Sequence, residues 1–219
     1  MQNDFRSHST RSKMKMTYRL VLTGILAAVS IVLMFFETPL PFMPPFLKFD
    51  LSDIPALFAA FVLGPVYAIV IEAVKNIFHL PTSGTMYVGE LANFLAGSFF
   101  TGTAGLIYQK LKSPKKAIWS FAGGIIVTTI FTSFFNYFFL LDFYANLFAK
   151  GSMDAIISMG SAMNSLVQDT KTMIVFAFVP FNLFKGIVVS VITGFLYWRL
   201  APVLKSNRFQ SKKNQGSGI

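Results

Sequence analysis

The sequence predicts an all-α integral membrane protein: a six-helix transmembrane bundle whose N- and C-termini are both cytoplasmic. Of its 219 residues, 54% are apolar and only 13% are charged, whereas a soluble domain carries about 25% charged residues. The charges also lie apart from the apolar stretches, since residues 91–109 and 117–141 contain no Asp, Glu, Lys or Arg. Runs of about 18 or more such residues are long enough to cross a bilayer.

The basic residues predict the orientation of the bundle. Most of the nineteen Lys and Arg residues adjoin apolar runs in three clusters, at 6–19, 110–116 and 199–213. Cytoplasmic segments beside spanning helices carry such an excess, so the net charge of +10 does not indicate nucleic acid. The chain is expected to comprise a basic cytoplasmic segment (1–16), a six-helix membrane domain (17–204) and a basic polar tail, expected to be disordered (205–219).

The first half of the membrane domain is expected to hold three helices. The first runs from about 18 to 36 and is followed by a loop, 37–50, whose prolines cannot continue a helix. A Gly-Pro pair at 64–65 interrupts the next apolar run, which predicts two short helices at about 53–63 and 66–80. One kinked helix is the alternative, but only two helices bring every basic cluster to one side of the membrane.

The second half is expected to hold three more helices. One runs from about 86 to 111, and a basic turn at 112–116 leads into another at about 117–141. The stretch 142–171 mixes charged residues with Gly, Ser, Met and Asn, so we expect an outer loop that contains a short surface helix. The sixth helix, about 173–200, returns the chain to the cytoplasm.

Motifs for catalysis and metal binding are missing from the sequence. It contains no GxxxxGK[ST] phosphate loop, no HExxH and no GxSxG. Cysteine is absent as well, and the two histidines, His8 and His79, are far apart. We therefore expect no enzyme activity, no catalytic or metal-binding residues and no cofactor.

Three polar residues within the expected spans predict a binding site. Asn182 and Lys185 share one face of the sixth helix, and Asn136 reaches a similar depth on the fifth at about 1.5 Å per residue. Amides offer a donor and an acceptor side by side, which suits the imide edge of a heterocycle, and the surrounding aromatic rings suit a flat ligand. The alternative is that these amides hold helices together.

Other polar residues in the spans are open to two interpretations. Glu72 and Lys75 are three residues apart and are expected to form an internal ion pair, and His79 is expected at the membrane interface. Glu90 is either a charge that stabilises the start of its helix or part of a cavity that Asn93 faces.

The first helix contains small residues four positions apart, Gly24 and Ala28, with Ala27 beside them. Such spacing permits close helix approach. Packing inside the bundle and docking of a partner protein are equally compatible with it.

Six segments together resemble the riboflavin-specific substrate-binding (S) component of energy-coupling factor (ECF) transporters. These segments are 44–55 (PPFLKFDLSDIP), 61–65 (FVLGP), 74–76 (VKN), 90–94 (ELANF), 136–141 (NYFFLL) and 180–186 (PFNLFKG). The resemblance extends over about residues 17–204.

The resemblance implies a bacterial, multi-pass cell-membrane protein that captures riboflavin from outside. It also implies docking on a transmembrane coupling (T) subunit and two ATPase subunits, through the small residues Gly24, Ala27 and Ala28. The residues expected to bind riboflavin are Asn136, Asn182, Lys185, Asn93, Glu90, Lys48, Leu47 and Tyr137.

The expected function is high-affinity capture and uptake of riboflavin by the S component of an ECF-type ABC importer, with ATP hydrolysed by partner subunits. The alternatives are the same scaffold with another vitamin, such as folate or thiamine, an intramembrane enzyme, and a stand-alone secondary carrier. A folate site would need more cationic groups for the glutamate tail, and an enzyme would need clustered acidic or histidine residues.

Overall fold

The computed structural model describes residues 2–113 and 115–213, with the side chains of 16–113 and 115–199. It is helical almost throughout. The α-helices are α1 (Gln2–Met34), α2 (Asp53–Val62), α3 (Pro65–His79), α4 (Val88–Lys110), α5 (Lys116–Phe135), α6 (Leu141–Phe148), α7 (Met153–Ser161), α8 (Thr170–Met173) and α9 (Val179–Lys213). The other elements are a 3₁₀ turn, η1 (Leu80–Thr82), two π-helical segments, η2 (Asn136–Leu140) and η3 (Ile174–Phe178), and two short antiparallel strands, β1 (Thr38–Pro39) and β2 (Lys48–Phe49).

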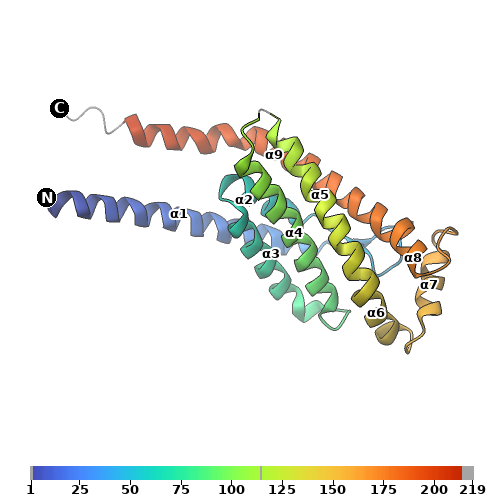
Figure 1. Cartoon of the computed structure of the whole chain (residues 1–219). Helices are drawn as coiled ribbons and strands as arrows, with labels where there is room; N and C mark the ends of the chain where they lie inside the picture. The colour runs from blue at the N-terminus through green and yellow to red at the C-terminus, as the bar shows by residue number, and fades with distance from the viewer. Residues whose placement is uncertain (1, 114, 214–219) are drawn as a thin grey trace.

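The long helices form one bundle. Helix α4 packs against both α3 and α5, α9 packs against α5 and α2, and α1 packs against α2 and α3. The first turns of α1, the last turns of α9 and the adjoining ends of α4 and α5 lie at one end of the bundle, whereas α6, α7 and α8 lie at the other (Figure 1). The three stretches that carry the basic clusters therefore share one end, as the predicted topology requires.

Three described stretches are long and apolar enough to cross a membrane: Met16–Met34, Lys116–Phe148 and Thr170–Arg199. The second is a continuous helical path through α5, η2 and α6, and the third runs through α8, η3 and the first part of α9. The all-helical class is confirmed, and the count of six crossings stays a prediction.

The fifth expected helix does not end at residue 141. It continues to Phe148 because Leu141, Tyr144 and Ala145 are buried in one core cluster with Ile156 of α7. The expected outer loop is correspondingly shorter, and it contains α7 as its surface helix.

The C-terminal helix is also longer than expected, because α9 extends to Lys213. The expectation of disorder is therefore wrong for residues 205–213, where Lys, Arg and Gln are good helix formers. Residues 214–219 lie outside the described part of the chain.

Aromatic side chains fill the bundle near the end where α1 begins. The rings of Phe61 and Tyr108 stack with centroids 4.2 Å apart, and the hydroxyl groups of Tyr108 and Tyr197 lie 2.7 Å apart. Phe100 belongs to the same core cluster and also lines the cavity described below. This packed region therefore closes the cavity toward the end of the bundle where α1 begins.

Candidate ligand-binding site

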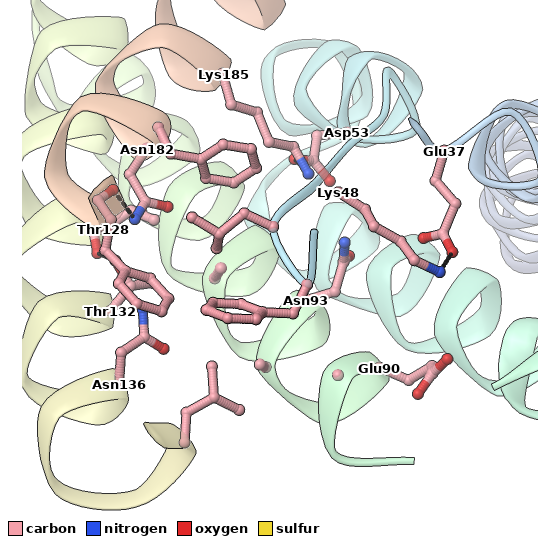
Figure 2. A pocket seen from close by; sticks show the side chains of 18 of the residues that line it. Glu37, Lys48, Asp53, Glu90, Asn93, Thr128, Thr132, Asn136, Asn182 and Lys185 are labelled. Atoms are coloured by element: carbon pink, nitrogen blue, oxygen red, sulfur yellow. Dashed lines mark hydrogen bonds and ion pairs between the residues drawn. The ribbon is translucent and has the colours of Figure 1, made fainter. Parts of the chain in front are cut away.

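A cavity lies between α4, α5, α9 and the α1–α2 loop (Figure 2). Its empty space, including the part open to solvent, is about 1080 Å³. Most predicted binding residues line it: Asn136, Asn182, Lys185, Asn93, Glu90, Lys48 and Leu47. The packing of these helices and the loop thus brings together residues that are far apart in the sequence.

One wall of the cavity carries a row of polar side chains at four-residue spacing, Thr128, Thr132 and Asn136. This spacing places them on one face of the α5–η2 path. The Thr132 hydroxyl donates to the carbonyl of Thr128 at 2.8 Å, while the Thr128 hydroxyl is buried without a hydrogen-bond partner. Asn136 is only 5% exposed, and none of the hydrogen bonds among the described residues involves its amide. This amide is therefore available to a ligand.

Asn182 is held in place by its own helix. Its Nδ2 donates to the carbonyl of Phe178 at 2.8 Å, and Phe178 is the last residue of the π-helical segment η3. That bond leaves Asn182 Oδ1 as an acceptor for a ligand. π-helical turns are frequent at functional sites, and here one precedes Asn182 while the other begins at Asn136.

Lys185 is paired with two carboxylates. Its Nζ lies 2.8 Å from Asp50 Oδ2 and 3.2 Å from Asp53 Oδ2, and the Lys185 and Asp53 side chains point toward each other (Figure 2). Asp53 begins α2, and Asp50 lies in the loop before it. The two aspartates thus compensate the lysine charge inside the bundle.

The same ion-pair network continues to α3. Lys75 contacts Asp53 and lies 2.7 Å from Glu72 Oε2, which confirms the predicted internal pair. Its Nζ also donates to the Ser52 hydroxyl at 2.7 Å. Lys75 and Glu72 are fully buried, so the network anchors the start of α2 to α3 as well as to α9.

Asp50 is the member of this network that lies in the loop. Burial by itself would raise the pKa of the Asp50 carboxyl, but the ammonium groups of Lys185 and Lys75 outweigh burial and hold that pKa below its ordinary value. Asn93 Nδ2 of α4 also lies 3.4 Å from Asp50 Oδ2. The loop therefore presents a charged carboxylate that several helices bind.

Glu90 both lies in the first turn of α4 and lines the cavity, so both interpretations of this residue hold. Its carboxylate accepts from Ser83 Oγ at 2.7 Å and from Thr85 Oγ1 at 3.3 Å. His79 Nδ1 lies 3.2 Å from Glu90 Oε1. His79 is 5% exposed and is the last residue of α3, and its expected place at the membrane interface stays a prediction.

The loop covers part of the cavity. Lys48 and Glu37 form an ion pair next to the two short strands, and both residues line the cavity. Phe46 packs on Tyr144 and Phe178, with ring centroids 5.3 and 6.1 Å apart. The loop thus contributes a ring, Phe46, to the aromatic surface that Tyr144 of α6 and Phe178 of η3 form.

Tyr137 is not among the cavity-lining residues. It packs edge-on against Phe138 with centroids 4.9 Å apart and contacts the adjoining core cluster. Tyr137 therefore packs beside the cavity instead of lining it.

Sequence reasoning missed Asp50, Asp53, Thr128 and Thr132. A lysine within a span requires a counter-charge, and this was the signal that could have directed attention to the two aspartates. The threonines could have been found from their spacing to Asn136, four and eight residues away.

The small residues of α1 do not all face the same way. Gly24 and Ala28 are exposed, whereas Ala27 is buried in a core cluster with Ala56, Ala59 and Ile71 of α2 and α3. Only Gly24 and Ala28 are therefore accessible to a partner protein. The placement of Ala27 on that face is corrected accordingly.

Apolar helices around an aromatic, amide-lined cavity are typical of a membrane protein with a pocket for a small molecule. The model of a family described as "ECF transporter, substrate-specific component" matches residues 18–197. The chain belongs to this family of transport components, which confirms both the resemblance and the prediction that it is not an enzyme.

Named relatives agree with this family. The chain is 40% identical to the riboflavin transporter RibU of Staphylococcus aureus (strain TCH60) over 192 residues, which are 88% of this chain and 95% of the relative. It is 33% identical to the riboflavin transporter FmnP of Bacillus subtilis (strain 168), over 87% of this chain and 95% of the relative. A solved structure described as the S component of a bacterial ECF transporter superposes with a TM-score of 0.70 at 38% identity, covering 87% of this chain and 99% of the other.

Proposed function

We propose that this chain captures riboflavin from outside the cell and delivers it as the S component of an ECF-type importer. The observation that carries the proposal is the convergence of the Asn136 and Asn182 amides with Lys185 on an aromatic-lined cavity. The names of the relatives point to the same ligand.

The chemistry of the cavity suits a flavin. The isoalloxazine ring is flat and ends in an imide, which pairs with amide donors and acceptors such as those of Asn136 and Asn182. The rings of Phe46, Tyr144 and Phe178 provide an apolar surface for it. The ribityl hydroxyls are donors and acceptors, and they suit the Glu90 carboxylate and the Asn93 amide.

Lys185 acts in this proposal as a hydrogen-bond donor and not as a counter-ion. Riboflavin is uncharged, and Asp50 and Asp53 already compensate the ammonium charge. An ammonium group has three donors, so two ion-pair contacts leave one for the ligand. Leu47 and Lys48 would cover the ligand from the loop.

The proposed orientation places both termini and the α4–α5 turn in the cytoplasm of a bacterial cell, with six crossings of its membrane. Basic residues beside the spans support this orientation, and the cavity then lies in the outer half. The exposed face of α1 around Gly24 and Ala28 is proposed to dock on the T subunit. Two ATPase subunits would supply the energy of transport.

The test is an optical one. The protein is purified in detergent from cells grown with riboflavin, and its visible spectrum is recorded before a fluorescence titration with added riboflavin. A yellow protein with a flavin spectrum and stoichiometric quenching is expected. A colourless protein that leaves riboflavin fluorescence unchanged would contradict the proposal and direct the search to other vitamins, such as folate or thiamine.

A second experiment distinguishes an S component from a stand-alone carrier. Reconstituted alone in vesicles, the chain is expected to bind riboflavin without accumulating it. Accumulation without any ATPase subunit would favour the secondary carrier.

A further inference from the structure

Each positive group on the cavity, within the described residues, already has a carboxylate partner. Lys185 pairs with Asp50 and Asp53, and Lys48 pairs with Glu37. The third lining carboxylate, Glu90, contacts the ring of His79, which does not itself line the cavity. The ionisable residues that line the cavity comprise three carboxylates, Glu37, Asp53 and Glu90, and two ammonium groups. An anionic ligand would therefore find no uncompensated cation.

Glu90 is the cavity-lining carboxylate that contacts neither Lys185 nor Lys48. Its side chain is 7% exposed and that of Lys48 is 40% exposed. Salt and water screen exposed charges far more than buried ones, so repulsion from Glu90 outweighs attraction by Lys48. Ser83 and Thr85 also donate hydrogen bonds to the Glu90 carboxylate and hold it in place.

We infer that Glu90 makes this cavity select the uncharged flavin against its 5′-phosphate ester. This inference rests on the proposed function and adds a specificity-determining residue to it. Asn136 and Asn182 lie on one side of the cavity and Glu90 and Asn93 on the other (Figure 2). A flavin whose imide edge binds the two amides therefore extends its ribityl chain toward Glu90.

The group at the end of the ribityl chain, a hydroxyl in riboflavin and a phosphate in its ester, then decides which ligand binds. A terminal hydroxyl donates a hydrogen bond to a carboxylate, which only accepts. A phosphate ester has no such donor when fully ionised and carries a charge of about −1.5 to −2 at neutral pH. Like charges brought together in a binding site cost several kcal/mol, so the ester is disfavoured.

The experiment compares riboflavin with riboflavin 5′-phosphate in fluorescence titrations of the purified full chain at constant ionic strength. The wild-type protein is expected to bind the phosphate ester at least about tenfold more weakly. In Glu90→Gln this ratio of affinities should narrow by about tenfold, because the amide keeps the shape of the side chain and removes its charge. The matched control is Asp154→Asn, an exposed carboxylate of α7 outside the cavity, which should leave the ratio unchanged.

A second variant covers the case in which Glu90→Gln fails to fold. Glu37→Gln leaves the Lys48 cation without its partner, and it should also narrow the ratio. Equal affinities in the wild-type protein, or an unchanged ratio in the variants at the cavity, would overturn this inference alone. Absence of riboflavin binding by the wild-type protein would overturn the proposed function as well.

Discussion

Lys185 and Asp50 are 135 positions apart in the chain, yet Nζ of the lysine lies 2.8 Å from Oδ2 of the aspartate. The lysine belongs to α9, and the aspartate lies in the loop, three residues before the start of α2 at Asp53. Their side chains are 14% and 1% exposed. This ion pair therefore joins the loop over the cavity to the helix that supplies two of the predicted binding residues.

Replacing Lys185 should affect both stability and binding. Lys185→Met leaves the buried carboxylates of Asp50 and Asp53 less compensated, and breaking such a pair costs about 3–5 kcal/mol. The midpoint of thermal unfolding should fall, and riboflavin affinity should fall at least about tenfold, the loss of one charged hydrogen bond.

The double variant Asp50→Asn/Lys185→Met separates the two effects. It should regain part of the lost thermal stability, because one orphaned charge is removed, while riboflavin affinity stays low. A double variant no more stable than Lys185→Met would show that the pair does not account for the loss.

Asn136→Ala should weaken riboflavin binding at least about tenfold without unfolding the protein, because a buried ligand hydrogen bond is lost. The Asn136 amide makes no hydrogen bond with another described residue, so its removal takes no hydrogen bond away from the fold. The control is Asn146→Ala, an exposed amide of α6, which should leave fluorescence titrations unchanged. Wild-type affinity in Asn136→Ala would remove this residue from the site.

Tyr137→Phe should leave riboflavin affinity within about twofold of the wild type, because this residue does not line the cavity. Tyr137 packs on Phe138 beside the cavity. The same titration tests this prediction. A loss comparable to that of Asn136→Ala would place Tyr137 back among the binding residues.

Gly24→Leu should spare binding and impair transport. A Cβ at Gly24 would meet no atom of the chain within 4 Å, so the fold tolerates a larger side chain there. The readouts are riboflavin titration and uptake by cells that hold the partner subunits. Full transport would show that this part of α1 does not dock on the T subunit.

Ala27→Leu tests the buried side of α1. Ala27 is buried among α2 and α3, so a larger side chain should lower the thermal midpoint, as overpacking costs about 1–3 kcal/mol. An unchanged midpoint would contradict the placement of Ala27 in the core.

Gly97→Ala should destabilise the protein although alanine favours helices. A Cβ at position 97 would overlap the carboxylate of Glu72, which is fully buried beside Lys75. The matched control is Gly102→Ala on the same helix, where the nearest atom, Ile69 Cδ1, would lie at an ordinary 3.4 Å. Equal thermal midpoints for the two variants would show that the Glu72 side chain moves without cost.

The sequence by itself predicted the helices of the bundle and the polar residues worth testing. Apolar runs free of charge and the Gly-Pro break at 64–65 are local features, so the starts of α2, α3 and α4 lie within two residues of their predicted positions. Asn136, Asn182 and Lys185 stood out because polar side chains are costly within a span. The π-helical segments were not predicted, since the same residues also suit an ordinary α-helix.

Only the tertiary structure decided which of these residues meet. The partners of Lys185 depend on how the loop folds back over the bundle, and loop paths are set by contacts between residues far apart in sequence. The same holds for the direction of Tyr137 and for the burial of Ala27 and His79, each of which changes with a small rotation of its helix. Composition and periodicity predict where a helix forms. The side of that helix that faces a cavity is determined by its packing against the other helices.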